Sequence, residues 1–308
     1  MSLVSVIVVT YGAKDYWRGC LDALMRQTLN TVEVILVDNS QDSKLSLVIT
    51  SQYPRVIYHC ESKNLFYASG LNKGISLSSG EFLLCMNDDV VLAPDFIERS
   101  IKGFDAGTCV GMVSGKILRE GGNIIDSTGL FLSIFRTASE RGYNRVDKGE
   151  FNKQGRIFGP SGAAAFYRRQ ALDEVSSNGE YFDPDFRMFY EDLDLAWRLQ
   201  RKGWRGVYLP EALAYHTRGA SARTGTGLNK RFARNYLSDE LYWGLVKNRY
   251  LAIVKNESLA GFLLHLPFIL FYDLFTWGVI LFTRPRLFCN LPSLLKLLIS
   301  TLRHRKKV

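Results

Sequence analysis

The chain has 308 residues, a length that allows one large α/β domain with an appendage or two modest domains. Apolar residues make up 47% and charged residues 22%, which fits a globular protein with a sizeable core and excludes a disordered chain. Most of the net charge of +9 lies in residues 247–308, where ten Lys and Arg accompany two acids and give +8, so the rest of the chain is near neutral. Because this basic segment is also strongly apolar, it favours an anionic membrane surface as partner rather than nucleic acid.

The first hundred residues alternate between strand and helix patterns. Val4–Thr10 is a β-branched run typical of a strand covered on both faces, and Trp17–Met25 has apolar residues at helical spacing. Further strands are predicted at Val32–Val37, Val56–His59 and Glu81–Met86, with helices at Ser43–Ser51 and Ala68–Ser78. This alternation predicts an α/β fold with a mostly parallel sheet, whose ligands bind beyond the carboxyl ends of the strands.

Two clusters of acids indicate the chemistry. Asn87-Asp88-Asp89 closes a predicted strand, and acids there suit a divalent cation that also binds substrate phosphates. Glu191-Asp192 opens a predicted helix, where the positive end of the helix dipole keeps a general base ionised. A cation and a base together fit a diphosphate leaving group beside a hydroxyl that must lose its proton. The pattern therefore predicts glycosyl transfer.

The region after Asn256 changes character. Residues 258–283 are long and apolar enough to span a bilayer, but His265, Pro267 and Asp273 interrupt them, and a mid-membrane Asp costs about 2.5–3.5 kcal/mol. A last helix is predicted at Ser293–Arg303. Three environments stay open for this segment: helices lying in the membrane interface, which we favour, a packed soluble cap, or a true span.

The cysteines and the start of the chain carry two further expectations. The five cysteines are scattered without a CxxC pair, so buried reduced thiols are expected. The chain enters a strand at once, without a secretory signal pattern, so a cytosolic setting is expected.

Six stretches resemble family 2 inverting glycosyltransferases of GT-A fold, most closely the bacterial rhamnosyltransferase type. They lie in family order at residues 6–11, 37–40, 64–74, 87–89, 159–164 and 182–203. The resemblance implies a Rossmann-like central sheet flanked by helices. It places a catalytic domain at 1–246, with a nucleotide-binding half at about 1–103 and an acceptor half at 104–246. Residues 247–308 then form membrane-associating helices.

The resemblance also implies roles on the donor side. Asp38 would hold the nucleoside, while Thr10 and Tyr11 would line the base and ribose. Asp89 matches the metal-binding acid. Asn87 replaces an acid of the family motif, so a ribose contact suits it better. The remaining donor and metal candidates are Asn64, Asp88 and His216, the last as a second metal ligand that hints at manganese.

On the acceptor side, Asp192 matches the base, while Glu191 either orients the acceptor or supports the helix start. Asp194 and Arg198 are expected to form a salt bridge within the helix. Gly162-Ala163-Ala164 either leaves room for the donor sugar or packs closely.

Two further features concern the loops. Phe66 stands where relatives commonly have Gly, which makes the donor-side loop bulkier. Arg218 and Arg223, around Gly219–Gly227, either close over the diphosphate or lie in a solvated loop.

The function expected is transfer of a sugar, with rhamnose as one candidate, from a dTDP- or UDP-sugar with Mn²⁺ or Mg²⁺. The acceptor is a hydroxyl of a glycan or polyprenyl-linked intermediate in cell-surface polysaccharide synthesis. The protein is expected on the inner face of the cell membrane, attached through residues 257–308. Two alternatives stay open: a non-catalytic, membrane-associated nucleotide-sugar-binding protein, and a sugar-phosphate nucleotidyltransferase.

Overall fold

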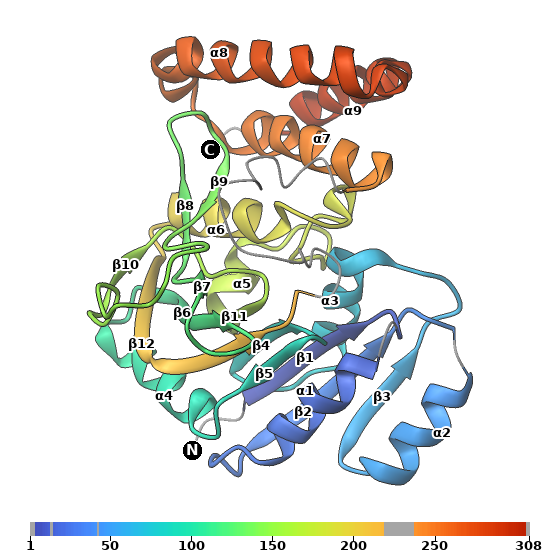
Figure 1. The fold of residues 1–308 in the computed structure, drawn as a ribbon, viewed down its shortest axis with the longest axis vertical. Helices are drawn as coiled ribbons and strands as arrows, with labels where there is room; N and C mark the ends of the chain where they lie inside the picture. The colour runs from blue at the N-terminus through green and yellow to red at the C-terminus, as the bar shows by residue number, and fades with distance from the viewer. Residues whose placement is uncertain (1–3, 13–14, 42, 219–236, 306–308) are drawn as a thin grey trace. The chain divides into compact units, whose positions relative to one another are not determined.

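The computed structural model describes residues 4–12, 15–41, 43–218 and 237–305. These residues form two compact units (Figure 1). The first contains residues 4–131 and 140–218, and the second contains a hairpin tip, Leu132–Ser139, with the residues from 237 onward. The boundary expected at residue 246 falls inside a helix of the second unit, α7 (Asp239–Asn256).

Four parallel strands form one half of the sheet in the first unit. In sheet order they are β4 (Phe82–Asn87), β1 (Val4–Thr10), β2 (Val32–Asp38) and β3 (Val56–Cys60). Their register places Thr10 opposite Asp38 on β2, and Val9 opposite Asn87 on β4. The carboxyl ends of three neighbouring strands therefore lie level at one edge of the sheet, as the sequence predicts.

The other half of the sheet is mixed. It contains β11 (Ala164–Arg168), β6 (Val110–Arg119), β12 (Arg205–His216) and β10 (Gly155–Ile157), in that order after β4. β11 is antiparallel to both β4 and β6, whereas β12 is parallel to β6. Six of the eight strands along the described sheet thus run one way, which confirms the mostly parallel α/β fold. Short strands are β5 (Val90–Leu92), β7 (Ile125–Ser127), β8 (Leu130–Leu132) and β9 (Ala138–Glu140).

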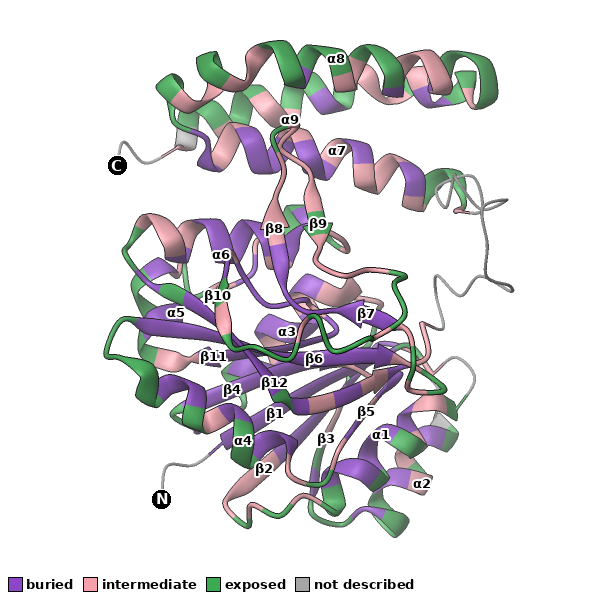
Figure 2. Ribbon diagram, turned by 60° about the vertical axis from the view of Figure 1, so that its left-hand side comes forward, coloured by how far each residue is buried: buried purple, intermediate pink, exposed green. Residues whose placement is uncertain are grey.

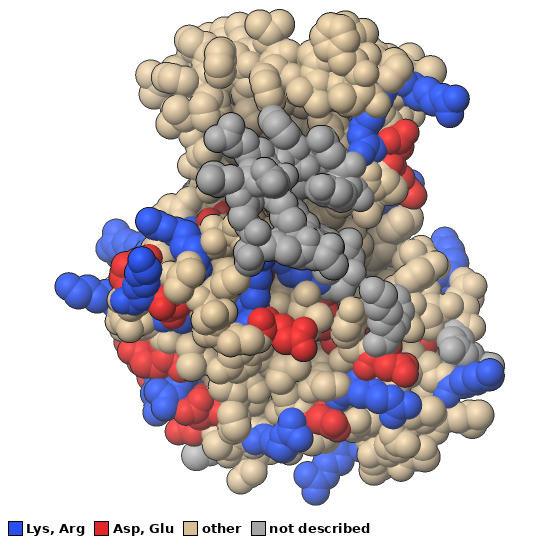
Figure 3. Space-filling view, viewed as in Figure 1, with Lys and Arg blue, Asp and Glu red and all other residues tan. Residues whose placement is uncertain are grey.

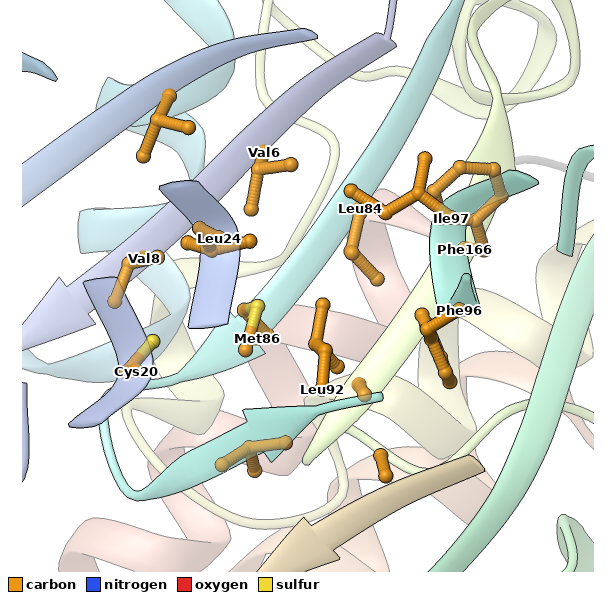
Figure 4. Close-up of a cluster of buried hydrophobic side chains, with 14 of the residues drawn as sticks. Val6, Val8, Cys20, Leu24, Leu84, Met86, Leu92, Phe96, Ile97 and Phe166 are labelled. Carbon is orange, nitrogen blue, oxygen red and sulfur yellow. The ribbon is translucent and has the colours of Figure 1, made fainter. Parts of the chain in front are cut away.

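Side chains of the central strands alternate between two core clusters, one on each face. Val6 and Val8 belong to one, which the close-up of Figure 4 shows, and Ile7 and Val9 belong to the other. The first is covered by α1 (Tyr16–Met25), α2 (Ser43–Gln52) and α4 (Phe96–Lys102), and the second by α3 (Phe66–Ser76), α5 (Arg169–Val175) and α6 (Glu191–Arg201). Because both faces are covered, these strands are apolar along most of their length.

A bulge in β12 depends on one glycine. β12 pairs with β6 up to Leu209 opposite Gly115 and resumes at Leu213 opposite Lys116, so Pro210 lies between the two paired stretches. Proline cannot donate a ladder hydrogen bond, which makes a bulge a suitable place for it. A Cβ at Gly115 would lie 2.3 Å from the carbonyl oxygen of Ala212. This close approach sets the register of the part of β12 that leads to the polar edge.

The second unit is helical. Its helices are α7, α8 (Leu259–Thr283) and α9 (Leu291–His304), with a 3₁₀ segment at Pro285–Asn290. Within the described residues, α8 alone is long and apolar enough to cross a membrane. Asp273, in the middle of α8, forms an ion pair with Arg249 of α7. The apolar run is therefore a continuous helix, and its internal acid is neutralised by a partner that the sequence pattern did not identify.

The cysteines differ in part from expectation. Cys20 and Cys85 are buried, whereas Cys60, Cys109 and Cys289 are exposed, and all five are free. The expectation of buried thiols is wrong for the exposed three because they lie at element ends. Cys60 closes the edge strand β3, Cys109 precedes β6, and Cys289 lies in the 3₁₀ segment after α8.

Replacing Gly115 by alanine should lower the free energy of unfolding by about 1–3 kcal/mol, because the added methyl group meets backbone that cannot move aside cheaply. Urea unfolding followed by circular dichroism measures the change. Gly155→Ala is the matched control: a Cβ there has nothing within 4 Å, so a change within about 0.5 kcal/mol is expected. Equal losses in the two variants would contradict the packing explanation.

Candidate active site

The strand ends place a threonine against an acid. Thr10, the last residue of β1, is buried and donates its hydroxyl to Asp88 Oδ2 at 2.6 Å. Asp88 follows the neighbouring strand β4, so this bond joins the two strand ends. Burial raises the pKa of Asp88 to about 6, and the charge of Asp89 adds to the rise, while the Thr10 hydroxyl opposes it. The residues predicted to meet the donor at this edge are therefore adjacent.

Asp38 is fully buried and both of its carboxylate oxygens have partners. Oδ1 accepts from the Ser40 N–H at 2.7 Å, and Oδ2 accepts from the Tyr58 hydroxyl at 2.7 Å. Each oxygen keeps a second lone pair, so these bonds leave capacity for another donor. Tyr11, directly after β1, is 62% exposed. Nucleoside binding by these residues stays a prediction.

The loop containing Asn64 is fixed by amide side chains. Asn64 Oδ1 accepts from the Phe66 N–H at 2.7 Å, and Asn39 donates to the Phe66 carbonyl at 3.2 Å. Phe66 has a φ of 60°, in the left-handed region where glycine is unstrained. A glycine at this position would adopt the same backbone conformation without strain. In this chain the Arg187 guanidinium lies over the Phe66 ring, 4.8 Å from its centroid.

A buried histidine joins two acids, one in the turn between β4 and β5 and one in β7. His216, the last residue of β12, has Nε2 3.1 Å from Asp89 Oδ1 and Nδ1 2.8 Å from Asp126 Oδ2. Burial lowers the pKa of His216, but the two carboxylates outweigh it and raise the pKa to about 9. Burial raises the pKa of Asp126, but the interactions with His216 and Arg218 lower it by more. The pKa of Asp126 therefore lies below its ordinary value.

These residues fit a divalent cation that takes some of its ligands from the protein and the others from the substrate. Asp89 supplies a carboxylate and His216 an imidazole, while Asp126 holds the second ring nitrogen, as acids commonly do behind metal-binding histidines. The described residues contain no group of three or more His, Cys, Asp or Glu that could hold a metal ion. Two protein ligands leave coordination positions for diphosphate oxygens and water, which suits Mg²⁺ or Mn²⁺ bound with a nucleotide.

Asp192 lies in the first turn of α6, where backbone donors hold its carboxylate. Oδ2 accepts from the Gly162 N–H at 2.8 Å and Oδ1 from the Leu193 N–H at 2.7 Å. The preceding Phe189 and Tyr190 both have φ near 70°, a strained entry of the kind found at functional sites. Burial raises the pKa of Asp192, although the N–H groups oppose it. A raised pKa makes a carboxylate a stronger general base.

Glu191 differs sharply from its neighbour. Its side chain is buried, and within the described part of the chain Oε2 has no hydrogen-bond partner. Burial raises the pKa of Glu191 well above its ordinary value, and the charge of Asp192 raises it further. Burial therefore favours the protonated form of this carboxyl, which argues against proton abstraction by Glu191, and its role in acceptor orientation or at the helix start stays a prediction.

Gly162 joins the two acid clusters. Its N–H binds Asp192, and the next residue, Ala163, accepts through its carbonyl from the Asn87 N–H at 3.1 Å. Tyr67 donates its hydroxyl to the Gly162 carbonyl at 2.7 Å. A Cβ at Gly162 would lie 3.1 Å from Asp192 Oδ2, so this glycine packs closely against the predicted base. The turn with Asp88 and Asp89 and the start of α6 consequently meet at one edge.

Sequence reasoning missed two acids of the site, Asp126 and Glu140. Glu140, which ends β9, accepts from the Ser161 hydroxyl at 2.9 Å and from Ser127. Burial raises the pKa of Glu140 to about 7, and Asp192 contributes to the rise. One sequence signal could have identified Asp126, which directly follows the apolar pair Ile124-Ile125. In the structure it lies in the short buried strand β7.

The other charged residues singled out in the sequence have different outcomes. Asp194 and Arg198 form the expected salt bridge at 2.9 Å, which confirms their structural role. Arg218 pairs with Asp126 and lies 4.8 Å from the Tyr143 ring centroid. Arg223 and the Gly219–Gly227 segment lie outside the described residues.

Comparison with known proteins identifies relatives. The family described as Glycosyl transferase family 2 matches residues 5–176, more than half of the chain. An N-acetylglucosaminyl-diphospho-decaprenol L-rhamnosyltransferase of Mycobacterium tuberculosis is 24% identical over 267 residues, 78% of this chain and 83% of that protein. EpsH of Bacillus subtilis is 32% identical over 105 residues, 32% of this chain and 29% of that protein. The structure of GalNAc-T7 with UDP, GalNAc and Mn²⁺ superposes with a TM-score of 0.61 at 12% identity, covering 83% of this chain and 48% of that chain.

These matches agree with the geometry. The chain spans less than half the length of EpsH and of the GalNAc-T7 chain, so those two likenesses concern a shared domain. At 12% identity the structural match shows the fold, which is GT-A. The family match includes the strand ends with Thr10, Asp38 and Asp89, and it ends before α6. The chain belongs to glycosyl transferase family 2.

Proposed function

We propose that this protein is a metal-dependent inverting glycosyltransferase. It moves a sugar from a dTDP- or UDP-sugar to a hydroxyl of a glycan or polyprenyl-linked acceptor in cell-surface polysaccharide synthesis. Rhamnose is the sugar to test first, because the mycobacterial relative is named as an L-rhamnosyltransferase with a diphospho-decaprenol substrate. Residues 257–308 hold the enzyme at the inner face of the cell membrane.

One observation carries the proposal. The Gly162 N–H binds Asp192, and the adjacent Ala163 carbonyl binds the Asn87 N–H in the segment that continues into Asp88 and Asp89. The predicted base and the predicted cation-binding acid therefore share one edge of the sheet. This is the arrangement that attack by a hydroxyl on a nucleotide sugar requires.

The roles of the residues follow from their positions. Asp192 takes the proton from the acceptor hydroxyl as that oxygen attacks the anomeric carbon. The bond from that carbon to the diphosphate oxygen breaks with its electron pair, and single displacement inverts the configuration. Asp89 and His216 would hold the cation, with Asp126 orienting the imidazole. When bound, the cation offsets the negative charge of the departing diphosphate.

Replacing Asp192 by asparagine should lower kcat about 10²- to 10⁴-fold while donor binding persists, because the amide cannot accept the proton. Nucleotide release and calorimetric donor binding measure the two effects. For the unmodified protein, kcat/KM should fall on the acid side at a pH above about 3.9, the ordinary aspartate value, since burial raises the pKa of Asp192. An active Asp192→Asn variant would overturn the assignment.

Glu191→Gln is the matched neighbour, and it should keep activity within about tenfold. Since burial favours the protonated Glu191 carboxyl, the neutral amide should replace it at little cost. The same nucleotide-release assay measures it. A loss as large as that of Asp192→Asn would show that Glu191 takes part in proton transfer or acceptor positioning.

Asp126→Asn should weaken Mn²⁺ binding about 10- to 100-fold in the presence of UDP or dTDP, because the His216 ring loses its orienting carboxylate. Direct titration of Mn²⁺ by electron paramagnetic resonance measures affinity without turnover. Glu120→Gln, at an exposed acid, serves as control. Unchanged Mn²⁺ affinity in Asp126→Asn would refute the metal site, and so would full activity after chelation with EDTA.

A donor panel separates the remaining alternatives. Family membership argues against a sugar-phosphate nucleotidyltransferase. The non-catalytic alternative predicts that nucleotide sugars raise the melting temperature while no nucleotide is released with Mn²⁺ and a polyprenyl-linked acceptor. Turnover with dTDP-rhamnose or a UDP-sugar supports the transferase. A protein that binds every donor tested and turns over none would favour the binding protein.

A further inference from the structure

The helix α8 has the reverse of the usual arrangement of a water-exposed helix. Its exposed large side chains are all apolar and include Leu263, Leu264, Leu270, Phe271, Leu274 and Phe282. Its polar and amphipathic side chains at 265, 272, 273, 276 and 277 are buried or half-buried. Figure 2 shows the exposed stripe along α8, and in Figure 3 the surface at α8 has no charged side chain on the visible side.

The two kinds of residue occupy opposite arcs of the helix. At 100° per residue, positions 259, 263, 270, 274 and 281 fall close together, and 264, 271, 275 and 282 lie beside them. Positions 265, 269, 273, 276 and 280 fall on the other side. The apolar arc covers about half the circumference and continues along the whole helix. Water-facing surfaces of monomers rarely expose an apolar patch of that extent.

An ion pair and a hydrogen bond attach the inner arc of α8 to the rest of the second unit. Asp273 pairs with Arg249 of α7, and Arg249 donates to the Phe135 carbonyl at 2.7 Å. His265 Nδ1 lies 2.9 Å from a guanidinium nitrogen of Arg136, which also pairs with Glu257. A spanning position for α8 would draw these charges into the hydrocarbon core with it, which is costly. An in-plane position keeps them on the aqueous side.

A basic border accompanies a second apolar stripe on α9. Leu295, Ile299 and Leu302 are exposed at helical spacing, and the exposed Lys296 and Arg303 follow the two leucines directly. Lys and Arg beside an apolar stripe match a surface of anionic headgroups over acyl chains. The charge identifies the occupant as anionic lipid rather than a second copy of this basic segment.

We propose that α8 lies in the plane of the membrane and inserts its Leu/Phe face into one leaflet that contains anionic lipid. The proposal deepens the membrane attachment in the proposed function. It is tested without donor or acceptor, so its failure would leave the transferase assignment untouched.

Vesicle flotation of the full chain tests the face. Leu264→Glu with Phe271→Glu changes side chains that are 71% and 69% exposed, so folding should be preserved, as circular dichroism can check. The fraction bound to phosphatidylcholine–phosphatidylglycerol vesicles should fall at least about tenfold, given the apolar area withdrawn from lipid. The control is Leu47→Glu on α2, at a leucine that is 72% exposed, and it should bind like the unmodified protein.

The outcomes discriminate between occupants. Equal flotation of the double variant and the control would overturn the proposal. A second contradicting outcome is an unmodified protein that does not bind vesicles and is dimeric, with a double variant that is monomeric. The apolar face would then be a subunit interface. Lys296→Glu with Arg303→Glu should reduce binding to anionic vesicles and bring it near the level on pure phosphatidylcholine. If this variant bound anionic vesicles as well as the unmodified protein does, anionic lipid would not be the partner of the basic residues.

Cysteine labelling separates an in-plane helix from a span. Single cysteines at Leu259 and Phe282, 75% and 86% exposed, are placed in a chain whose native cysteines are serine. The protein is added to sealed vesicles and treated with a membrane-impermeant maleimide before and after the vesicles are opened. For an in-plane helix, the labelling before opening divided by the labelling after opening should be the same at both positions. Labelling at one end only after opening would show a span and refute the proposal.

Discussion

The alignment of strand ends is the constraint on which the site depends. Thr10 of β1 stands opposite Asp38 of β2, and Val9 stands opposite Asn87 of β4, so three chain segments reach the same edge together. The antiparallel β11 starts at this edge, which lets the Gly162 N–H reach Asp192 while Ala163 binds Asn87. Without this register the two acid clusters would lie on unrelated surfaces.

Concentrating acids at one edge has an electrostatic consequence. Burial raises the pKa values of Asp88 and Glu140, to which the charges of Asp89 and Asp192 respectively add, whereas His216 and Arg218 lower the pKa of Asp126. The histidine therefore occupies the position between carboxylates where positive charge is most stabilising. A region that already favours positive charge suits a cation with a diphosphate, and backbone N–H groups keep Asp192 available as an acceptor of protons.

The second unit shows how a charged residue can stabilise an apolar helix. Asp273 reads from the sequence as an interruption, yet it pairs with Arg249 and so fixes which arc of α8 faces inward. The outward arc is left wholly apolar. Under the proposed function, such a surface would hold the enzyme at the bilayer that contains a polyprenyl-linked acceptor.

Periodicity and local motifs determined much of this protein from the sequence alone. The family resemblance selected Asp89 and Asp192 within their acid clusters, whereas the residues themselves supplied the alternating strands and helices, the polar edge and the two clusters. These follow from local rules, because a buried parallel strand and an amphipathic helix each impose a repeat on neighbouring residues. Asp126 and Glu140 were not recognised, nor was the role of Arg249, because each acts through a partner distant in sequence. Burial of the cysteines and of Glu191 likewise depended on which surfaces came to face each other. Only the tertiary structure decided those pairings, since pairing across a sheet or between helices leaves no periodic trace in the chain.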